Sequence, residues 1–420
     1  MKDFNISYLS RLSYNSLIYI SLVIFTFFLP FRGNISSVIS ILIFALFFFN
    51  FKELKRTFTF FLRNKNALFF SLLFVIHLLG LIYTSNFKFA FTDLEIKLPL
   101  FFFPIIIASR WEEIKKYSNT FFFSFVFGCA IATLISISNS FIVYFKTNDV
   151  GSFFYGGISY LMHSSYYAMY LCLAIVLSVY LLEYSKNKLR LFLMFLIGLF
   201  VVNIILLSSR AGLLMLGITF FMGLLYFLYK RKYNYVLIVS FTMLVSIFFI
   251  LNFAPKVIQR FQKLNSQTVR KVDITKIDDI NSRDTRLVLA ELSLGLIRNN
   301  PILGVGTGDV KDVLLIEYKK NNFKVGIDQK LNCHNQYLQF MVTFGLIGIF
   351  VFIFGMYYPL LKQIRMHNWL FVYFIILVSI NFLFESILET KAGVEFYAFF
   401  SIITLLSGNR KILKVKEYAS

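Results

Sequence analysis

The sequence has few charged residues and few cysteines. Only 15% of its 420 residues are charged, against about a quarter in soluble domains, so a water-soluble globular fold is excluded. The three cysteines form no CxxC pair and no metal-type spacing, so neither a disulfide framework nor a zinc site is expected. The alternating pattern of transmembrane β-barrel strands is also absent.

Apolar residues dominate instead, with 58% hydrophobic residues and 55 Phe. Runs of membrane-helix length recur along the chain, and backbone groups in lipid must bond within their own segment. We therefore predict an all-α polytopic membrane protein with about 12 transmembrane helices, the first retained rather than cleaved. The predicted segments are 14–31, 35–51, 66–85, 89–109, 119–145, 160–183, 189–208, 211–229, 234–254, 335–361, 368–388 and 392–408.

The net charge of +21 does not require a nucleic-acid partner. Membrane topology explains it, because Lys and Arg gather in alternate short connections between the helices. The positive-inside rule then places both termini in the cytoplasm. We expect helices 1–9 over residues 1–254, a large outer loop at 255–334, helices 10–12 over 335–408, and a cytoplasmic tail at 409–420.

The outer loop combines different patterns. Residues 262–284 mix charges without periodicity, so a mobile stretch is expected. "TRLVLAELSLGLIRNNP" (285–301) predicts an amphipathic helix that ends at Asn-Asn-Pro. "GVGTGD" (304–309) precedes another short helix and lacks the strand and the GK[ST] of a phosphate loop. We interpret it as a tight turn that lets two backbones approach.

Two arginines on the outer face are candidate anion ligands. Arg210 lies in a short turn of "LLSSRAGLLML", where a helix-end arginine that reaches toward water is the alternative. Arg286, with Arg283 nearby, opens the loop helix and could equally be a solvated charge. A helix N-terminus disfavours a cation, so a bound counter-anion would explain Arg286 better. A guanidinium keeps its charge and forks onto phosphate oxygens.

His334 begins a long apolar helix, "HNQYLQFMVTFGLIGIF" (334–350). A structural role is common for such a residue, but the positive end of a helix dipole disfavours imidazolium. A neutral imidazole can act as a general base. A base beside arginines suits attack on carbon with a diphosphate leaving group, and because diphosphate already leaves readily, no separate general acid is required.

These stretches resemble the bacterial O-antigen ligase and O-antigen polymerase superfamily. The resemblance rests on "SSRAGLL" (208–214), on Arg286 fifteen positions before Pro301, and on "HNQYLQFMVTFGLIGIF". "KLPLFFFPII" (97–106) and "HSSYYAMYL" (163–171) also look like ligase-type members. Alanine follows Arg210 where many members have glycine, but the arginine itself is kept.

The resemblance implies a GT-C-like, inverting, metal-independent glycosyltransferase on the periplasmic side of the bacterial inner membrane. It would move a glycan from undecaprenyl diphosphate to a hydroxyl of lipid A-core, or of another glycan acceptor. Arg210 and Arg286 match the arginines thought to hold the donor diphosphate, and His334 matches the proposed base. A polymerase or a protein O-oligosaccharyltransferase would share these residues and stays an alternative.

Several further residues are secondary candidates. Intramembrane charges are functional by default and usually paired, so Lys97 either pairs with Glu389 or contacts sugar or phosphate. A transporter or flippase is a less favoured alternative, because the charges gather at one face and no repeat is evident. Cys333 has no assigned role. The secondary candidates are Asn335, Lys97, His163, Arg283, Glu389 and Lys391, and Glu385 is a further charge in the same region.

Overall fold

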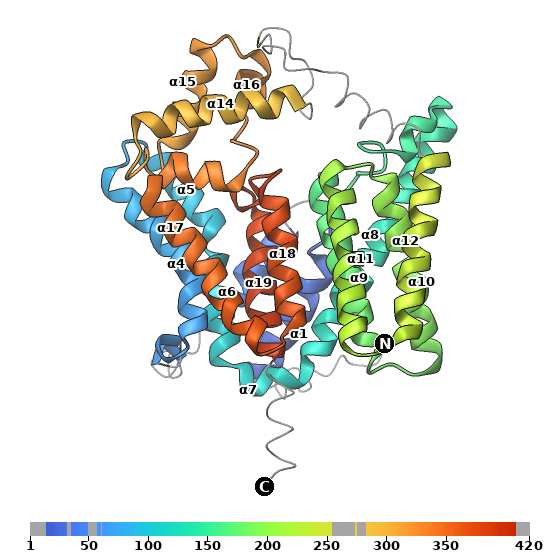
Figure 1. The fold of residues 1–420 in the computed structure, drawn as a ribbon. Helices are drawn as coiled ribbons and strands as arrows, with labels where there is room; N and C mark the ends of the chain where they lie inside the picture. Colours follow the sequence, from blue (N-terminus) through green and yellow to red (C-terminus); the bar gives the residue numbers. More distant parts are fainter. Residues whose placement is uncertain are drawn as a thin grey trace, which may run out of the picture.

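The computed structural model describes residues 14–31, 35–48, 57–59, 61–253, 274 and 283–408, and these ranges are helical without any strand (Figure 1). The principal helices before the loop are α1 (Tyr14–Phe28), α2 (Ile35–Phe48), α4 (Lys65–Leu79), α5 (Phe87–Lys97), α6 (Pro99–Ser109), α8 (Ser118–Thr147), α9 (Ser164–Leu182), α10 (Asn187–Leu206), α11 (Arg210–Tyr229) and α12 (Tyr233–Phe253). Those after it are α14 (Arg283–Asn299), α15 (Val310–Lys320), α16 (Lys324–Gln329), α17 (Gln336–Arg365), α18 (Trp369–Phe382) and α19 (Lys391–Ser407).

The core of the bundle is built around α19. Every side chain from Gly393 to Ser407 is buried, and α19 packs against α6 and α18. By contrast, only 6% of the apolar window of α12 is buried inside the protein, so this helix presents its hydrophobic surface outward. An outward apolar surface of this kind is what lipid contact requires.

Fewer than twelve helices in the described ranges have the length and hydropathy of a complete span. Each predicted segment coincides with a helix, but six helices of the described ranges are long and apolar enough to cross a membrane, or seven with one bent pair. The segment predicted at 89–109 is two helices, α5 and α6, because the chain breaks at Leu98 before Pro99. The chain is thus a multi-pass membrane protein, and twelve complete spans stay a prediction.

Both loop helices expected from the sequence are present, as α14 and α15. Figure 1 shows them, with the short α16, lying across the ends of the long helices. A second apolar core beneath them includes Leu289, Leu314 and Tyr318, so the loop packs as a unit of its own on the bundle. Of the stretch expected to be mobile, only Ile274, Arg283 and Asp284 are described, and the tail 409–420 also lies outside the described residues.

The "GVGTGD" turn docks against a kink in α17, which confirms a close approach of two backbones. Gly345 interrupts the helix with φ +61°. The freed backbone groups pair with the turn: Leu346 N–H donates to Pro301 O at 2.8 Å, and Gly306 N–H donates to Thr343 O at 2.9 Å. The loop that carries Arg286 is thereby fixed to the helix that follows His334.

Replacing Gly345 by alanine should destabilise the protein strongly. A Cβ there would lie 2.4 Å from the carbonyl carbon and oxygen of Ile302, and φ +61°, ψ −153° is a region that only glycine adopts readily. We expect a cost of about 3 kcal/mol or more, seen as a clear drop in the melting temperature of the detergent-purified protein. Gly295→Ala is the matched control, because its Cβ meets nothing within 4 Å and should be neutral or mildly stabilising. Equal melting of the two variants would contradict this account of the kink.

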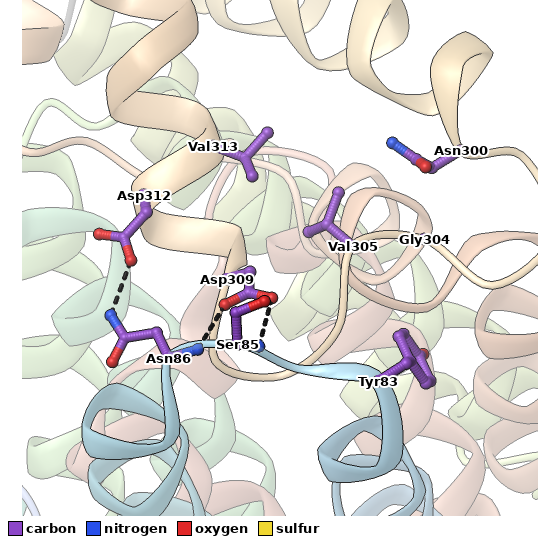
Figure 2. Close-up of a pocket in the computed structure, with 9 residues that line it drawn as sticks. All are labelled: Tyr83, Ser85, Asn86, Asn300, Gly304, Val305, Asp309, Asp312 and Val313. Atoms are coloured by element: carbon purple, nitrogen blue, oxygen red, sulfur yellow. Dashed lines mark hydrogen bonds between the residues drawn. The ribbon is translucent and has the colours of Figure 1, made fainter.

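The far end of the loop is pinned to the turn between α4 and α5 (Figure 2). Asp309 accepts from the backbone N–H groups of Ser85 at 2.8 Å and Asn86 at 2.7 Å. Asp312, in the first turn of α15, accepts from the Asn86 side chain at 2.7 Å. Carboxylates that accept from two backbone amides form strong, charge-assisted bonds, so this contact holds the loop rigidly.

Candidate active site

Glu385 is the centre of a cluster of charged and titratable side chains at the end of the bundle that the loop helices cover. It lies in the connection between α18 and α19, and its side chain is only 4% exposed. Arg286 donates from Nη2 to Oε1 at 3.2 Å, and His334 Nδ1 lies 3.2 Å from Oε2. His163 Nδ1 approaches Oε1 at 3.9 Å. One carboxylate therefore gathers an arginine and two histidines from three distant parts of the chain.

Arg210 and Arg286 line the same small pocket, of about 20 Å³. The other lining residues include His163, Ser164 and Tyr155. Arg286 also has a buried Nε that makes no hydrogen bond with any described residue. A buried guanidinium nitrogen without a partner is costly, and an anionic ligand would satisfy it.

The local backbone explains the position of Arg210. Ser208 has φ +47°, which reverses the chain after α10, and the Ser209 side chain accepts from Gly212 N–H at 3.3 Å as the cap of α11. Arg210 is the first residue of that helix. Ser209, Arg210 and Ala211 all line the arginine pocket, so the N-terminus of α11 and the arginine charge both favour an anion there.

His334 is held just outside a helix rather than at its first residue. Asn335 is the N-cap of α17 and its side chain accepts from Leu338 N–H, so His334 precedes the cap with φ +45°. This differs from the expectation that His334 begins the helix, and it weakens the dipole argument for a neutral ring. The Glu385 carboxylate is instead the nearest electrostatic influence on the imidazole.

The start of α17 is tied to the connection that carries Glu385. Asn335 N–H donates to Ser386 Oγ at 3.1 Å, and its side-chain amide donates to Leu383 O at 3.2 Å. Gln336 Oε1 accepts from Leu388 N–H at 2.8 Å. These bonds on both sides of Glu385 fix the distance between the carboxylate and the His334 ring.

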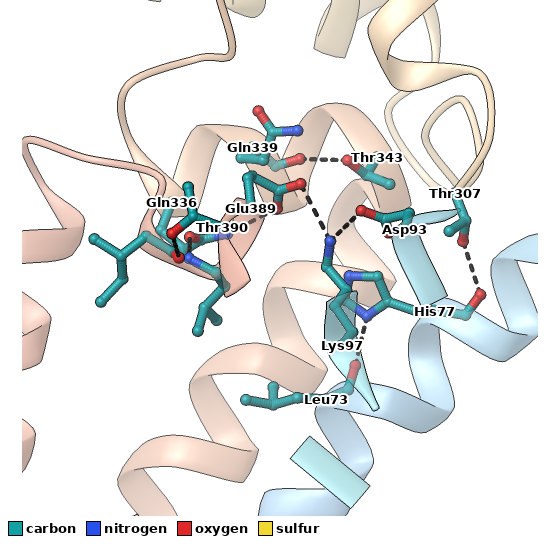
Figure 3. Close-up of polar contacts among 12 residues, drawn as sticks. Leu73, His77, Asp93, Lys97, Thr307, Gln336, Gln339, Thr343, Glu389 and Thr390 are labelled. Carbon is teal, nitrogen blue, oxygen red and sulfur yellow. Dashed lines mark hydrogen bonds and ion pairs between the residues drawn. The ribbon is translucent and has the colours of Figure 1, made fainter. Parts of the chain in front are cut away.

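A second polar cluster lies one turn away, around Lys97 (Figure 3). Lys97 has no exposed surface and contacts both Asp93 and Glu389, with Nζ 3.2 Å from Glu389 Oε2. The pairing of Lys97 with Glu389, one of the two alternatives raised by the sequence, is thus present. Gln336 bridges the two clusters, because it also donates to Glu389 Oε1 at 3.4 Å. Two carboxylates around one lysine leave it structurally paired.

The remaining candidates lie at the periphery of this face. Lys391, the first residue of α19, pairs with Glu95 at 3.0 Å, and both side chains are exposed. Arg283 is the first residue of α14, three positions before Arg286, and is not among the residues that line the arginine pocket.

Cys333 is buried in the apolar core of the loop, and burial raises the pKa of its thiol to about 12, so it is not available as a nucleophile.

The role of Glu385 as a common partner was missed from the sequence. It was visible only as one of several charges in an apolar segment, and its partners lie 51 positions away at His334 and 99 at Arg286. The one available signal was the rule that an intramembrane carboxylate requires a partner.

The fold and this site together define a multi-pass membrane protein with an arginine-lined pocket beside a carboxylate–histidine pair. Residues 192–353 match the family model described as O-antigen ligase, which confirms the superfamily indicated by the motifs. The match contains Arg210, Arg286 and His334, and Glu385 and His163 lie outside it. This family implies membrane glycosyltransferase activity of the O-antigen ligase or polymerase type. No curated protein matches the chain.

Proposed function

We propose that the protein transfers a glycan from undecaprenyl diphosphate to a hydroxyl of lipid A-core, at the periplasmic face of the inner membrane. The observation that carries the proposal is the convergence of Arg210 and Arg286 on one pocket, beside a histidine held by Glu385. Fixed cations stabilise a departing diphosphate, and a base is needed for the incoming hydroxyl.

The chemistry follows from these positions. The acceptor oxygen attacks the anomeric carbon from the face opposite the diphosphate, a new C–O bond forms, and the C–O bond to the diphosphate breaks. His334 takes the hydroxyl proton through Nε2, because its Nδ1 lies 3.2 Å from the Glu385 carboxylate, which favours a proton on Nδ1 and leaves Nε2 as the acceptor. The bond electrons leave with the diphosphate, whose charge Arg210 and Arg286 stabilise. Displacement from the opposite face inverts the configuration, and we propose that no metal takes part.

A polymerase that extends the lipid-linked chain, or a protein O-oligosaccharyltransferase, would use the same three residues. The ligase reading is supported by the ligase-like "KLPLFFFPII" and "HSSYYAMYL" stretches. A flippase is less favoured, because the two ion-paired clusters around Glu385 and Lys97 lie at helix ends and not along a path across the bundle.

Deletion of the gene should separate these alternatives. A ligase predicts loss of long chains from lipid A-core while lipid-linked chains are still made, as shown by electrophoresis of lipopolysaccharide and by extraction of lipid-linked glycans. Loss of the long lipid-linked chains themselves would identify a polymerase, and unglycosylated protein with normal lipopolysaccharide would identify a protein transferase. Purified protein that moves no glycan from lipid diphosphate to any of these acceptors would refute the enzyme proposal.

A further inference from the structure

A second pocket lies away from the arginines, at the opposite end of α14. It has a volume of about 790 Å³ and forms an open groove between the loop and the turn after α4 (Figure 2). Ligand sites commonly occupy about 300–1,000 Å³. Asn300, next to the C-terminal end of α14, lies about 20 Å from Arg286 along the helix axis, at a rise of about 1.5 Å per residue. Neither the arginines nor His334 line it.

The lining of the groove combines neutral polar groups with apolar surface. Asn300 and Asp312 offer an amide and a carboxylate, while the Asn86 amide is already bonded to Asp312. The Tyr83 ring, Val305 and Val313 offer apolar contact. In Figure 2, the Asn300 and Asp312 side chains stand on opposite sides of the opening, with Val305 and Tyr83 between them and below. Hydroxyl groups pair with amides and carboxylates, while the C–H face of a sugar ring packs on an aromatic ring.

The charge of the lining residues restricts the class of ligand that the groove can bind. The chain carries a net charge of +21, yet no Lys or Arg lines the groove, and two aspartates do. An anionic diphosphate would be repelled there. A divalent cation is not favoured either, because both Asp309 oxygens already accept from backbone amides. A neutral ligand that is rich in hydroxyl groups fits the lining best.

The groove is also preorganised. Asp309 pins its floor to residues 85–86, and Tyr83 Oη donates to Leu303 O at 2.8 Å, so the ring is held in place. The Asn300 side chain makes no hydrogen bond among the described residues and is exposed. A rigid floor lowers the entropy cost of binding, and the exposed Asn300 amide at the rim is accessible to a ligand hydroxyl.

We propose that this groove binds a neutral saccharide, several sugar units away from the reacting carbon. The inference rests on the proposed function, which supplies two sources of saccharide: the distal part of the donor glycan and the acceptor. Because α14 carries Arg286 near one end and Asn300 next to the other, a glycan held in the groove would be aligned with the arginine pocket along the same helix.

Asn300→Trp tests the groove in the full-length protein, because it fills the opening from an exposed position. Asn299→Trp is the matched control, at an exposed position that does not line the groove. In transfer assays, Asn300→Trp should raise the KM for one of the two substrates, the donor or the acceptor, about tenfold. The kcat measured with a single-repeat donor and a truncated acceptor, which do not reach the groove, should stay unchanged. A rise only for long donor chains identifies the donor glycan, and a rise only for the acceptor identifies the acceptor. An unchanged KM for both refutes the groove.

A binding measurement separates this inference from the proposed function. The probe is fluorescently labelled glycan released from the surface polysaccharide of the source cells, followed by anisotropy. Weaker binding by at least tenfold in Asn300→Trp, but not in Asn299→Trp, supports the groove even if the wild-type protein transfers nothing, in which case only the proposed reaction fails. Absence of binding to wild-type protein, or equal binding by both variants, refutes the saccharide site.

Discussion

Replacing His334 by alanine should reduce glycan transfer by about 10²–10⁴-fold, the usual contribution of a positioned general base. The imidazole has its Nδ1 on the Glu385 carboxylate at 3.2 Å, which leaves Nε2 as the atom able to accept the acceptor proton. Alanine removes the proton acceptor but not the arginines, so donor binding should persist while kcat falls. Steady-state transfer by purified protein and binding of the lipid-diphosphate donor are the two measurements.

Two other histidines serve as comparisons for this variant. His163 also faces Glu385, at 3.9 Å, and is 38% exposed, so His163→Ala tests whether the base is the other ring near the same carboxylate. His367 stacks on Tyr229 beyond the end of α17 and should have no effect when replaced. Full activity of His334→Ala, or a larger loss in His163→Ala than in His334→Ala, would show that our assignment of the base is wrong.

The helical architecture could be predicted because hydropathy is a local property. Every predicted apolar segment coincides with a helix, and both loop helices occur where amphipathic periodicity and the Asn-Asn-Pro stop indicate. The span count could not be predicted as well, because hydropathy does not record a break such as the one between Lys97 and Pro99. The kink at Gly345 is likewise a tertiary feature, since it depends on the backbone of residues 301–302.

The site could be predicted only in part, because some of its residues are recognisable only by contacts with distant parts of the chain. Arg210, Arg286 and His334 stand out in the sequence because polar residues at the ends of apolar helices are conspicuous. Glu385 shows no such local pattern, since its significance comes from partners that the fold brings together. The same holds in part for Lys97: Asp93 is a local partner four residues earlier on α5, but Glu389 reaches Lys97 only because the fold brings the turn before α19 beside α5.

Glu385→Gln should lower kcat by about 10³–10⁴-fold, by analogy with carboxylate-to-amide changes that disorient a catalytic histidine. Glutamine keeps the size of the side chain but removes the negative charge 3.2 Å from Nδ1 of His334, so the ring can adopt the wrong tautomer or orientation. The same change should not weaken donor binding. Glu385 pairs with Arg286 in the protein without donor, and a diphosphate must compete with that carboxylate for the guanidinium.

The expected signature is therefore a fall in kcat together with an unchanged or lower KM for the lipid-diphosphate donor. Such a split means that the carboxylate acts on the chemical step and not on donor affinity. Glu389→Gln is the matched control on the neighbouring turn, where Lys97 keeps Asp93 as a partner, and it should lower the melting temperature more than kcat. If Glu385→Gln instead raises the donor KM while kcat stays near the wild-type value, Glu385 serves only to position Arg286, and the carboxylate–histidine pair has no part in proton transfer.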